Sequence, residues 1–582
     1  MTSLFDCTSG PLDAPIMLVG ESWGSEEAVQ KRPFVGGAGL ELDRMLAEAG
    51  IARNSILCTN VFNAQPEDNE AWHFFHDSST TSPRYRGLCP TNFAVSEIQR
   101  LEAQIRAVKP RLVIAAGNYA MWATADCCSI SSTSTGNGAT VRVPGGITSW
   151  RGSMLESATI PGLQLKVLPI LHPAAIMRAW YQRAVTVHDL RTRVPRALQN
   201  MWRPLTGPKV LAPGSFAETR ELLGLWKGQL DRGNGLRLSH DIETARGFIT
   251  CMSFATGPYD ETGTALVIPF VRPEGKIWRN FWSEREEIEL VQCIVAILSH
   301  PNIQIEGQNY LYDLQYIESS WGRCPRLDFD TMLAHHLLFP GTPKGLDYLS
   351  SLYCRYHWYW KEDLKEWNNS IDWEQNLRYN AEDSLRTFEC ASALRTLIRD
   401  HGMSELWEWE KRKNSMALSM MQKGVRINRE ARARLAFELS TALGERHSWL
   451  SSIIPQTWLK PFLKTSKSNW WESVHQQKTL FYEILGLKGQ TNRKTGKSTI
   501  NYEALQELKS RNPELSRIFD CLIDCRSIGI YHNTFIKAEL EPDGRMKCMF
   551  NTAGTSTFRW SSSSNAFGRG GNLQNIPMGE ED

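Results

Sequence analysis

The chain has 582 residues, which is enough for three or four domains with cores of their own. Its hydrophobic content of 42% and charged content of 22% are typical of an ordinary globular protein. A net charge of +2 excludes a global attraction to polyanions, so binding to nucleic acid has to come from local basic patches.

Cysteine usage and apolar patterning indicate where the chain resides. The 13 cysteines lack the regular spacing of a disulfide framework or a zinc site, so we expect reduced thiols in a cytosolic compartment. No apolar run reaches membrane-spanning length, and the N-terminus has no secretory signal pattern. We therefore expect a cytoplasmic protein without a membrane partner.

Strand-like runs alternate with helical segments in the first third of the chain. The runs IMLVG, RLVIAAG and LKVLPIL predict an α/β layer with a mostly parallel sheet. A Ser/Thr/Gly-rich segment after Cys128, SISSTSTGNGAT, predicts a mobile loop inserted in that domain. A nucleotide-binding Rossmann unit is the weaker alternative, because GESWG does not match G-x-G-x-x-G.

Three segments of this region carry a family resemblance: IMLVGESWGSEEAVQKRPFVGGAGLELDRMLAEAG, ILCTNVFNAQP and KVLPILHPAAIMR. Together they resemble the uracil-DNA glycosylase superfamily, nearest to its iron–sulfur-bearing thermophile-type branch, which implies an α/β/α sandwich over residues 1–202. By this resemblance Glu21 would position water or stabilise the oxocarbenium-like sugar, and Phe34 would stack on a flipped base. Asn60 would hydrogen-bond the uracil edge, and His172 would stabilise the departing uracil anion.

The same region departs from that family pattern at two positions. Trp23 stands where the branch has proline in GE-x-P-G, and Ala64 stands where a cluster-ligand cysteine follows the asparagine strand. Cys7 and Cys89 remain, but two thiolates do not hold a four-thiolate cluster, so we expect no iron–sulfur cluster. The domain is expected either to excise uracil or to be a retained fold that only grips DNA.

A Pro/Gly-punctuated stretch, RPLTGPKVLAPGS, predicts a linker over residues 203–216. After it, LRLSHDIE predicts a strand that carries Asp241 and Glu243, and a second alternating run, FITCMSFAT, follows a two-residue turn. A helix is predicted further on, because Ser283 and Glu286 form a capping-box pattern ahead of apolar positions at helical spacing.

Two later blocks place an acid four residues after a polar side chain. Asn309 precedes Asp313 in GQNYLYDLQ, and Tyr379 precedes Asp383 in RYNAEDSLR, so on helices each pair would share one face. Hard divalent cations prefer carboxylate oxygens, and paired ions clamp the attacking and leaving oxygens of a phosphodiester displacement. A tyrosine one turn from a metal-binding aspartate would orient the attacking water.

In order and spacing, these blocks resemble the proofreading 3′–5′ exonucleases with three aspartates, one glutamate and a tyrosine. Each motif alone occurs by chance in many chains, so their order carries the inference. The resemblance implies a ribonuclease-H-like domain with a mixed sheet over residues 217–402, in which Tyr379 orients water and Asn309 supports the site. It implies two Mg²⁺ (or Mn²⁺) ions held by Asp241, Glu243, Asp313 and Asp383. His335 and His336 are interpreted as packing or surface histidines rather than ligands.

The last third, residues 403–582, becomes helical and rich in charge. KRKNSMALSMMQKGVRINRE, KTLFYEILGL, KTGKSTINYEALQEL and TSTFRWSSSSNAFGRGGNLQNIP resemble, in this order, the thumb and early palm of family A DNA polymerases. KTGKS is not a Walker motif, because Thr491 stands where that motif needs glycine. The resemblance places Arg559, Gln574 and Asn575 near the primer-template. Basic residues that would contact duplex phosphates are Lys460, Lys464, Lys467, Lys478, Lys488, Arg493, Lys494 and Lys497.

After Pro577 only MGEED remains, without the strand that presents the first palm aspartate of that family. We therefore expect that this chain alone does not polymerise DNA, and that it is either one half of a split polymerase or a truncation. A split polymerase would need a separate polypeptide that carries the rest of the palm and the fingers. The resemblance implies the N-terminal part of a bacteriophage-type family A replicative polymerase, located in the host cytoplasm.

Two alternatives remain open at this point. The first is a standalone DNA-repair enzyme that couples uracil excision to end trimming, which would release uracil robustly. The second is a non-catalytic DNA-binding scaffold, which would bind primer-template without turnover. Asp241, Glu243, Asp313 and Asp383 argue against a degenerate exonuclease site, whereas Trp23 and Ala64 leave the scaffold open for the first domain.

Overall fold

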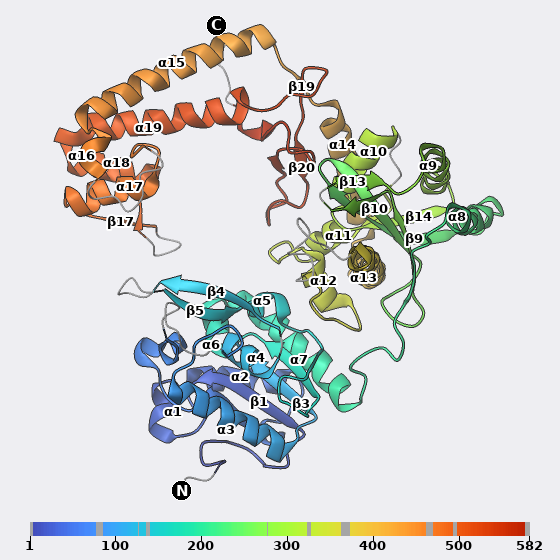
Figure 1. Ribbon diagram of the computed structural model, residues 1–582, viewed down its shortest axis with the longest axis vertical. Helices are drawn as coiled ribbons and strands as arrows, with labels where there is room; N and C mark the ends of the chain where they lie inside the picture. Colours follow the sequence, from blue (N-terminus) through green and yellow to red (C-terminus); the bar gives the residue numbers. More distant parts are fainter. Residues whose placement is uncertain are drawn as a thin grey trace. The chain divides into compact units, whose positions relative to one another are not determined.

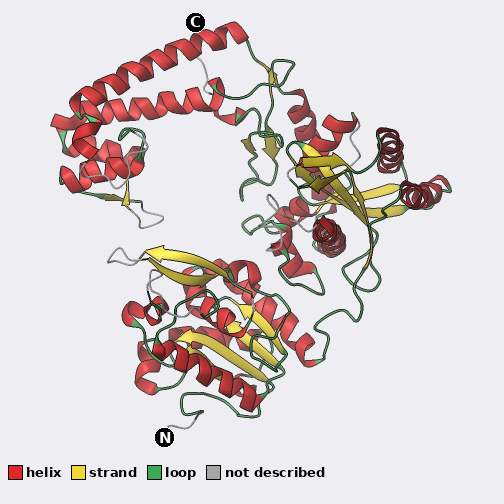
Figure 2. Cartoon of the chain, in the orientation of Figure 1, coloured by secondary structure: helices red, strands yellow, loops and turns green. Residues whose placement is uncertain are grey.

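A computed structural model describes residues 4–76, 85–125, 127–134, 140–275, 277–322, 327–361, 373–460, 469–492 and 498–576. The chain folds as two compact units, Met1–Lys411 and Arg412–Asp582 (Figure 1). Strands and helices alternate in the first unit, and helices dominate the second (Figure 2). The prediction of a mixed α/β multidomain chain is confirmed at this level. No helix in the described ranges combines the length and apolar character that crossing a bilayer requires.

The first sheet has the strand order β2-β1-β3-β7-β6. Four of its strands run parallel, and β6 pairs antiparallel with β7. The three apolar runs predicted as strands are β1, β3 and β7, and they are almost completely buried, as expected for strands covered on both faces. The strand bounds are β1 Ile16–Ser22, β2 Ile56–Phe62, β3 Leu112–Ala116, β6 Leu155–Ser157 and β7 Leu165–Ile170.

Helices cover both faces of this sheet, because its side chains alternate between two cores. Met17 faces a cluster built with α3 (Asn92–Val108) and α4 (Asn118–Thr124). Leu18 faces a second cluster built with α2 (Gly37–Glu48) and α7 (Arg183–Leu198). The remaining helices and strands of this region are α1 Ser25–Gln30, β4 Ser129–Ser134, β5 Thr140–Gly145, α5 Ile147–Trp150 and α6 Pro173–Arg178. Short 3-10 turns lie at Arg53–Ser55, Glu67–Asn69, Ala71–Phe74 and Trp180–Gln182.

The prediction of a mobile loop after Cys128 is wrong for the described residues of that segment. Strands β4 and β5 form an antiparallel hairpin there, with residues 135–139 of the predicted loop outside the described residues. Composition misled the prediction because Ile130 and Val141 pack against the domain core and fix the hairpin. The β-branched threonines and valines of the segment also suit a pleated surface.

The second sheet has the order β15-β14-β9-β10-β11-β8 and mixes parallel with antiparallel pairs. The predicted strand with Asp241 and Glu243 is β9, and the second alternating run is β10. Arg246 and Gly247 between them both have positive φ, as a tight hairpin turn requires. The strand bounds are β8 Lys209–Leu211, β9 Leu236–Ala245, β10 Phe248–Ala255, β11 Thr264–Pro269, β14 Ile303–Gly307 and β15 Phe329–Asp330.

The stretch 203–216 is more than a linker, because it supplies the edge strand β8, which pairs parallel with β11. Pro208 and Pro213 flank this strand on its two sides, and an edge strand tolerates neighbouring prolines because one of its sides needs no ladder donors. The prolines predicted a break in regular structure, but a strand of three residues fits between them.

Helices pack around the second sheet, and α13 (Trp373–Asp400) crosses it. Leu377, Ala381 and Leu385 of α13 form a buried cluster with side chains of β10 and β11. The predicted capping box is confirmed at the start of α9, where Ser283 and Glu286 bond reciprocally. The helices are α8 Phe216–Asp231, α9 Glu284–Leu298, α10 Leu311–Trp321, α11 Thr331–Leu338 and α12 Leu346–Tyr353, and a hairpin joins β12 Val271–Glu274 to β13 Ile277–Asn280.

The second unit is mainly helical, as predicted, around one apolar cluster that includes Trp470, Phe481 and Phe519. Its helices are α14 Ser404–Lys423 (which begins in the first unit), α15 Arg429–Ile453, α16 Gln456–Leu459, α17 Val474–Lys478, α18 Tyr502–Arg511 and α19 Ser516–Tyr531. Single helical turns lie at Thr479–Ile484, Pro513–Leu515, His532–Ile536 and Leu573–Asn575. Short ladders pair β16 Val425–Arg426 with β19 Arg545–Met546, β17 Gln490–Thr491 with β18 Ser498–Thr499, and β20 Met549–Asn551 with β21 Ser561–Ser563.

Candidate functional site

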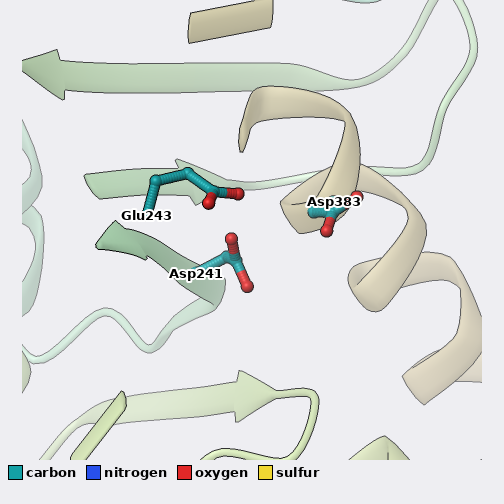
Figure 3. A group of neighbouring side chains, drawn as sticks. All are labelled: Asp241, Glu243 and Asp383. Carbon is teal, nitrogen blue, oxygen red and sulfur yellow. The ribbon is translucent and has the colours of Figure 1, made fainter. Parts of the chain in front are cut away.

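Three acids from distant parts of the chain meet at the second sheet. Asp241 and Glu243 lie two residues apart on β9, so both side chains leave the same face of the sheet. Asp383 comes from α13, which crosses that face. Carboxylate oxygens of the three residues lie within 4.8 Å of one another, and Figure 3 shows them turned toward a common space. Asp383 is buried, whereas the other two keep part of their surface exposed.

The electrostatics of this group favour a bound cation. Burial raises the pKa of Asp241 and of Glu243 well above the ordinary carboxyl value, and the neighbouring acids raise both further. Burial likewise raises the pKa of Asp383, although Lys361 and the Trp360 hydrogen bond oppose that rise. Like charges this close destabilise the ionised state unless a positive charge lies between them. The donor set is made of hard carboxylate oxygens, so these residues fit a divalent cation such as Mg²⁺ or Mn²⁺.

The fourth predicted ligand, Asp313, lies beside this group rather than within it. Its Oδ1 accepts a hydrogen bond from the Ile242 N–H at 3.1 Å, on the strand between Asp241 and Glu243. Burial raises its pKa well above the ordinary value, and the charge of Asp241 raises it further. Asp313 therefore lies beside β9, next to the residues that carry two of the three acids.

The prediction that Asn309 and Asp313 share a helical face is wrong. Helix α10 begins at Leu311, and Asn309 precedes it with φ 53°. Its N–H donates to Asp330 Oδ1 at 3.2 Å, and the Tyr310 N–H donates to Asp330 Oδ2 at 2.9 Å. Asparagine tolerates this left-handed conformation better than most residues, so the acid of β15 shapes the entry to α10.

Tyr379 and Asp383 do share a face of α13, as the four-residue spacing predicts. Tyr379 is buried, and burial together with the nearby charge of Asp383 raises the pKa of its phenol. The hydroxyl therefore remains protonated and is available as a hydrogen-bond donor beside the acids.

Sequence reasoning missed three polar neighbours of the acids. Trp360 Nε1 donates to Asp383 Oδ1 at 2.6 Å, and Lys361 Nζ lies 3.9 Å from Asp383 Oδ2. Asn380 Nδ2 donates to Asp241 Oδ2 at 2.7 Å. Asn380 stands one helical turn before Asp383, a spacing that would have revealed it. Trp360 and Lys361 lie in irregular backbone, where no periodicity signals a role.

A second constellation lies at the carboxyl edge of the first sheet, where parallel strands present their ends. A Cβ at Gly20 would lie 2.2 Å from Asn60 Oδ1 and 2.6 Å from Phe34 Cζ, so these two side chains meet over this glycine. Glu21 Oε1 accepts a hydrogen bond from the Tyr119 N–H at 3.1 Å. The Phe34 and His172 rings are 6.2 Å apart between centroids. The four residues predicted for this site therefore gather at one edge.

His172 is placed as a neutral donor. Burial lowers its pKa, while the charge of Glu21 opposes that shift. Its Nδ1 accepts a hydrogen bond from the Ala174 N–H at 3.3 Å, so in the neutral ring Nε2 carries the proton. A neutral imidazole of this kind can stabilise a developing anion by donating a hydrogen bond from its Nε2–H.

Glu27 organises the loop that carries Phe34, a role that the sequence did not reveal. Its carboxylate accepts hydrogen bonds from the N–H groups of Gly24, Val35 and Gly36 at 3.2, 3.2 and 3.0 Å. Phe34 has φ 57°, a conformation that a phenylalanine holds only when its surroundings impose it. The carboxylate joins the two ends of the loop and holds this strained residue in place.

The described cysteines of the first domain lie outside the group of residues with metal-ligating geometry. Cys7 is half-buried and Cys89 is buried. Among the described residues, the group with metal-ligating geometry is the set of three acids, Asp241, Glu243 and Asp383, and it contains no thiol. The donors for a four-thiolate cluster are therefore not gathered in the described part of the chain.

The residues predicted to face primer-template lie in the second unit. Arg559 is exposed, and its N–H donates to Thr555 Oγ1 at 2.9 Å. Gln574 and Asn575 are exposed in a single helical turn, where Gln574 Nε2 donates to the Trp560 carbonyl at 3.2 Å. Of the predicted basic positions, Lys464, Lys467, Arg493, Lys494 and Lys497 lie outside the described residues, as does the acidic tail.

Two family models match this chain. The Uracil DNA glycosylase superfamily matches residues 7–203, and the 3′-5′ exonuclease family matches residues 240–399. The Type-4 uracil-DNA glycosylase of Thermotoga maritima is 30% identical over 29% of this chain and 69% of its own length. That of Saccharolobus solfataricus is 27% identical over 34% of this chain and 76% of its own.

The second region matches longer proteins. DNA polymerase I of Rhizobium leguminosarum is 24% identical, and the alignment covers 49% of this chain and 27% of that relative. The POL domain of Pol1 from M. smegmatis, in complex with DNA primer-template and dNTP, has a TM-score of 0.43 and 17% identity, over 64% of this chain and 57% of that chain. The exonuclease assignment rests on the family model rather than on these relatives. Residues 240–399 form a metal-dependent 3′–5′ exonuclease domain of the DNA polymerase A type. Through its first 203 residues, the chain belongs to the uracil-DNA glycosylase superfamily, and it joins that domain to this exonuclease.

Proposed function

We propose that this chain is the N-terminal part of a family A DNA polymerase and proofreads primer 3′ ends with its exonuclease domain. The observation that carries the proposal is the meeting of Asp241, Glu243 and Asp383, with Tyr379 and Asp313 close by. The mixed second sheet with α13 across one face supports the proposal of a ribonuclease-H-like domain. The first sheet with helices on both faces supports that of a glycosylase-type α/β/α sandwich.

The residues of the site divide into holding and orienting roles. Asp241, Glu243 and Asp383 would hold divalent metal, with Asp313 completing the set for a second ion. Bound metal supplies Lewis-acid stabilisation of the oxygens that attack and leave phosphorus. The Tyr379 hydroxyl would orient the attacking water by hydrogen bonding.

Asp241→Ala tests this assignment directly. A 5′-labelled primer-template with a mismatched 3′ end is incubated with the purified chain in Mg²⁺ or in chelator. We expect a ladder of shortened primers in Mg²⁺ only, and its loss in Asp241→Ala without a loss of folding. The matched control is Asp231→Ala, an exposed acid of the same domain. Equal digestion by the wild-type chain and Asp241→Ala would sink the assignment.

The first domain offers a second activity, uracil excision, supported by the meeting of Asn60, Phe34, Glu21 and His172. Uracil release from a uracil-containing strand, absent in Asn60→Ala and in His172→Ala, would support it. Binding to the same strand without release would favour the alternative that this domain grips DNA as a scaffold. We propose that it acts without an iron–sulfur cluster, because Ala64 stands where a cluster-ligand cysteine would be, and Cys7 and Cys89 alone do not hold a four-thiolate cluster.

The helical second unit would serve as the thumb and part of the palm. In this proposal, exposed Arg559, Gln574 and Asn575 would meet primer-template, and exposed Lys460 and Lys488 would meet its phosphates. A bacteriophage-type family A polymerase is proposed on the sequence resemblance alone.

A further inference from the structure

An irregular segment between α12 and α13, the strap Cys354–Lys361, runs between the glycosylase-like and exonuclease parts of the first unit. Its aromatic residues pack against both parts. Tyr356 is buried in a core of the glycosylase-like domain, and Trp360 is buried in a core of the exonuclease domain. Trp358 packs against clusters of both domains. The strap is therefore shared by two hydrophobic cores.

Backbone hydrogen bonds fasten the strap to the glycosylase-like domain. The Met154 N–H donates to the His357 carbonyl at 2.7 Å, and the Tyr359 N–H donates to Ser153 Oγ at 3.1 Å. Ser153 and Met154 are buried just before β6. These two bonds hold consecutive parts of the strap against one edge of the first sheet.

An arginine of α7 fixes the start of the strap. Arg193 is 1% exposed, and its guanidinium donates to the carbonyls of Ser351, Cys354 and Arg355 at 2.8, 3.2 and 2.8 Å. A buried charge is tolerated only where its hydrogen bonds are satisfied, so these bonds tie the two domains together. Arg151, paired with buried Asp189, adds a bond to Ser351 Oγ at 2.9 Å.

The other end of the strap reaches the exonuclease acids. Trp360 donates to Asp383 Oδ1 at 2.6 Å, and Lys361 Nζ lies 3.9 Å from Asp383 Oδ2. Arg386, one turn after Asp383, donates to the Tyr356 carbonyl at 3.2 Å and lies over the rings of Trp358 and Trp360 at 4.6 and 4.2 Å from their centroids. The orientation of Asp383 therefore depends on a segment whose position the first domain sets.

We propose that the glycosylase-like domain is the anchor that positions the exonuclease metal site, through Arg193, the strap and Trp360. The proposal rests on the exonuclease function proposed above and assigns the first domain a positioning role that is independent of uracil excision. Partners of metal ligands change metal affinity or activity by about 10- to 100-fold when they are lost. Loss of the anchoring contacts should therefore weaken metal binding at the site that includes Asp383.

The test compares two arginines with matched bonding. Arg193→Met removes three bonds to strap-side carbonyls. Arg86→Met removes three bonds to the carbonyls of Trp122, Ala123 and Thr159, all within the glycosylase-like domain. Both variants should unfold at lower temperature. Only Arg193→Met should weaken Mn²⁺ binding, measured by electron paramagnetic resonance, and slow digestion, each by about tenfold or more.

Two smaller changes keep the test decisive if Arg193→Met does not fold. Ser153→Ala removes the acceptor of the Tyr359 N–H, and Trp360→Phe removes the donor to Asp383 while keeping an aromatic ring. Both should weaken Mn²⁺ binding in the same direction. Wild-type Mn²⁺ affinity in the folded anchor variants Arg193→Met and Ser153→Ala, or an equal loss in Arg86→Met, would overturn the proposal.

Failure of the proposed exonuclease function gives a different result. A wild-type chain that binds Mn²⁺ but digests no DNA would contradict the exonuclease function. The comparison of Mn²⁺ affinity between Arg193→Met and Arg86→Met would still decide the positioning role.

Discussion

Asp241, Glu243 and Asp383 place three acids where their charges repel one another. Such an arrangement costs stability whenever the acids are ionised without a cation, and it persists because the sheet and α13 hold the side chains together. Tyr379, Trp360 and Asn380 contribute hydrogen bonds that fix where the oxygens point. Affinity for metal and metal-free instability are two consequences of the same geometry.

The metal-free chain should lose stability as pH rises. The folded-state pKa values of Asp241 and Glu243 are raised, so the folded chain binds these protons more tightly than the unfolded chain does. Their contribution is complete below the ordinary carboxyl pKa of about 4 and is lost as pH rises through the raised values. In chelator, the unfolding temperature of the wild-type chain should fall as pH rises through that window, and that of Asp241→Asn should fall less. Identical pH slopes would contradict this, and Mg²⁺ should restore wild-type stability at the upper end.

At the scale of elements, one acid joins three segments of the exonuclease domain. Asp330 ends β15, caps α11 by accepting from the N–H groups of Met332 and Leu333, and accepts from those of Asn309 and Tyr310 before α10. Helix α10 carries Asp313, so this capping acid controls how that side chain meets β9. It is buried and takes no part in the three-acid group.

Asp330→Ala should lower the free energy of unfolding by about 3 kcal/mol, because four backbone donors lose a charged acceptor. Urea unfolding gives this value, and digestion of single-stranded DNA should slow in parallel as Asp313 shifts. Asp330→Asn retains one acceptor oxygen and should lose less. The matched control is Ser283→Ala at the cap of α9, which should cost about 1 kcal/mol and leave digestion unchanged. Unchanged digestion by Asp330→Ala would argue against a role in holding α10.

At the scale of the whole molecule, two enzyme-type domains form one compact unit, and the helical remainder forms another. The first unit is continuous because buried arginines, Arg151 and Arg193, bond across its two domains. A joint built from buried arginines with several hydrogen bonds each is less tolerant of motion than a flexible linker would be. The domains should therefore respond together to ligands.

Calorimetry should detect the first unit as one transition rather than two. Cooperative unfolding is expected where cores are shared, as they are through Trp358. Mn²⁺, for which the proposed exonuclease site exists only in the folded chain, should shift this transition as a whole. In Arg193→Met the transition should split, and only one part should then respond to Mn²⁺. A wild-type chain whose glycosylase-like part melts without responding to Mn²⁺ would contradict a shared unit.

The features that could be predicted from the amino-acid sequence are those that depend on local periodicity and spacing. Alternating apolar residues predicted β9 and β10, the capping box predicted the start of α9, and the four-residue spacing placed Tyr379 with Asp383. These patterns are local because backbone geometry repeats every two residues in strands and every 3.6 in helices.

Features that depend on partners distant in the sequence could not be predicted and emerged only from the fold. The hairpin of β4 and β5 forms because Ile130 and Val141 reach a core, and Asn309 leaves the helix because Asp330 binds its N–H. Trp360 gained its place beside Asp383 from contacts with a domain far away in sequence. Such contacts follow no period along the chain, because the energy that selects them comes from burial and hydrogen bonding between segments that meet only on folding.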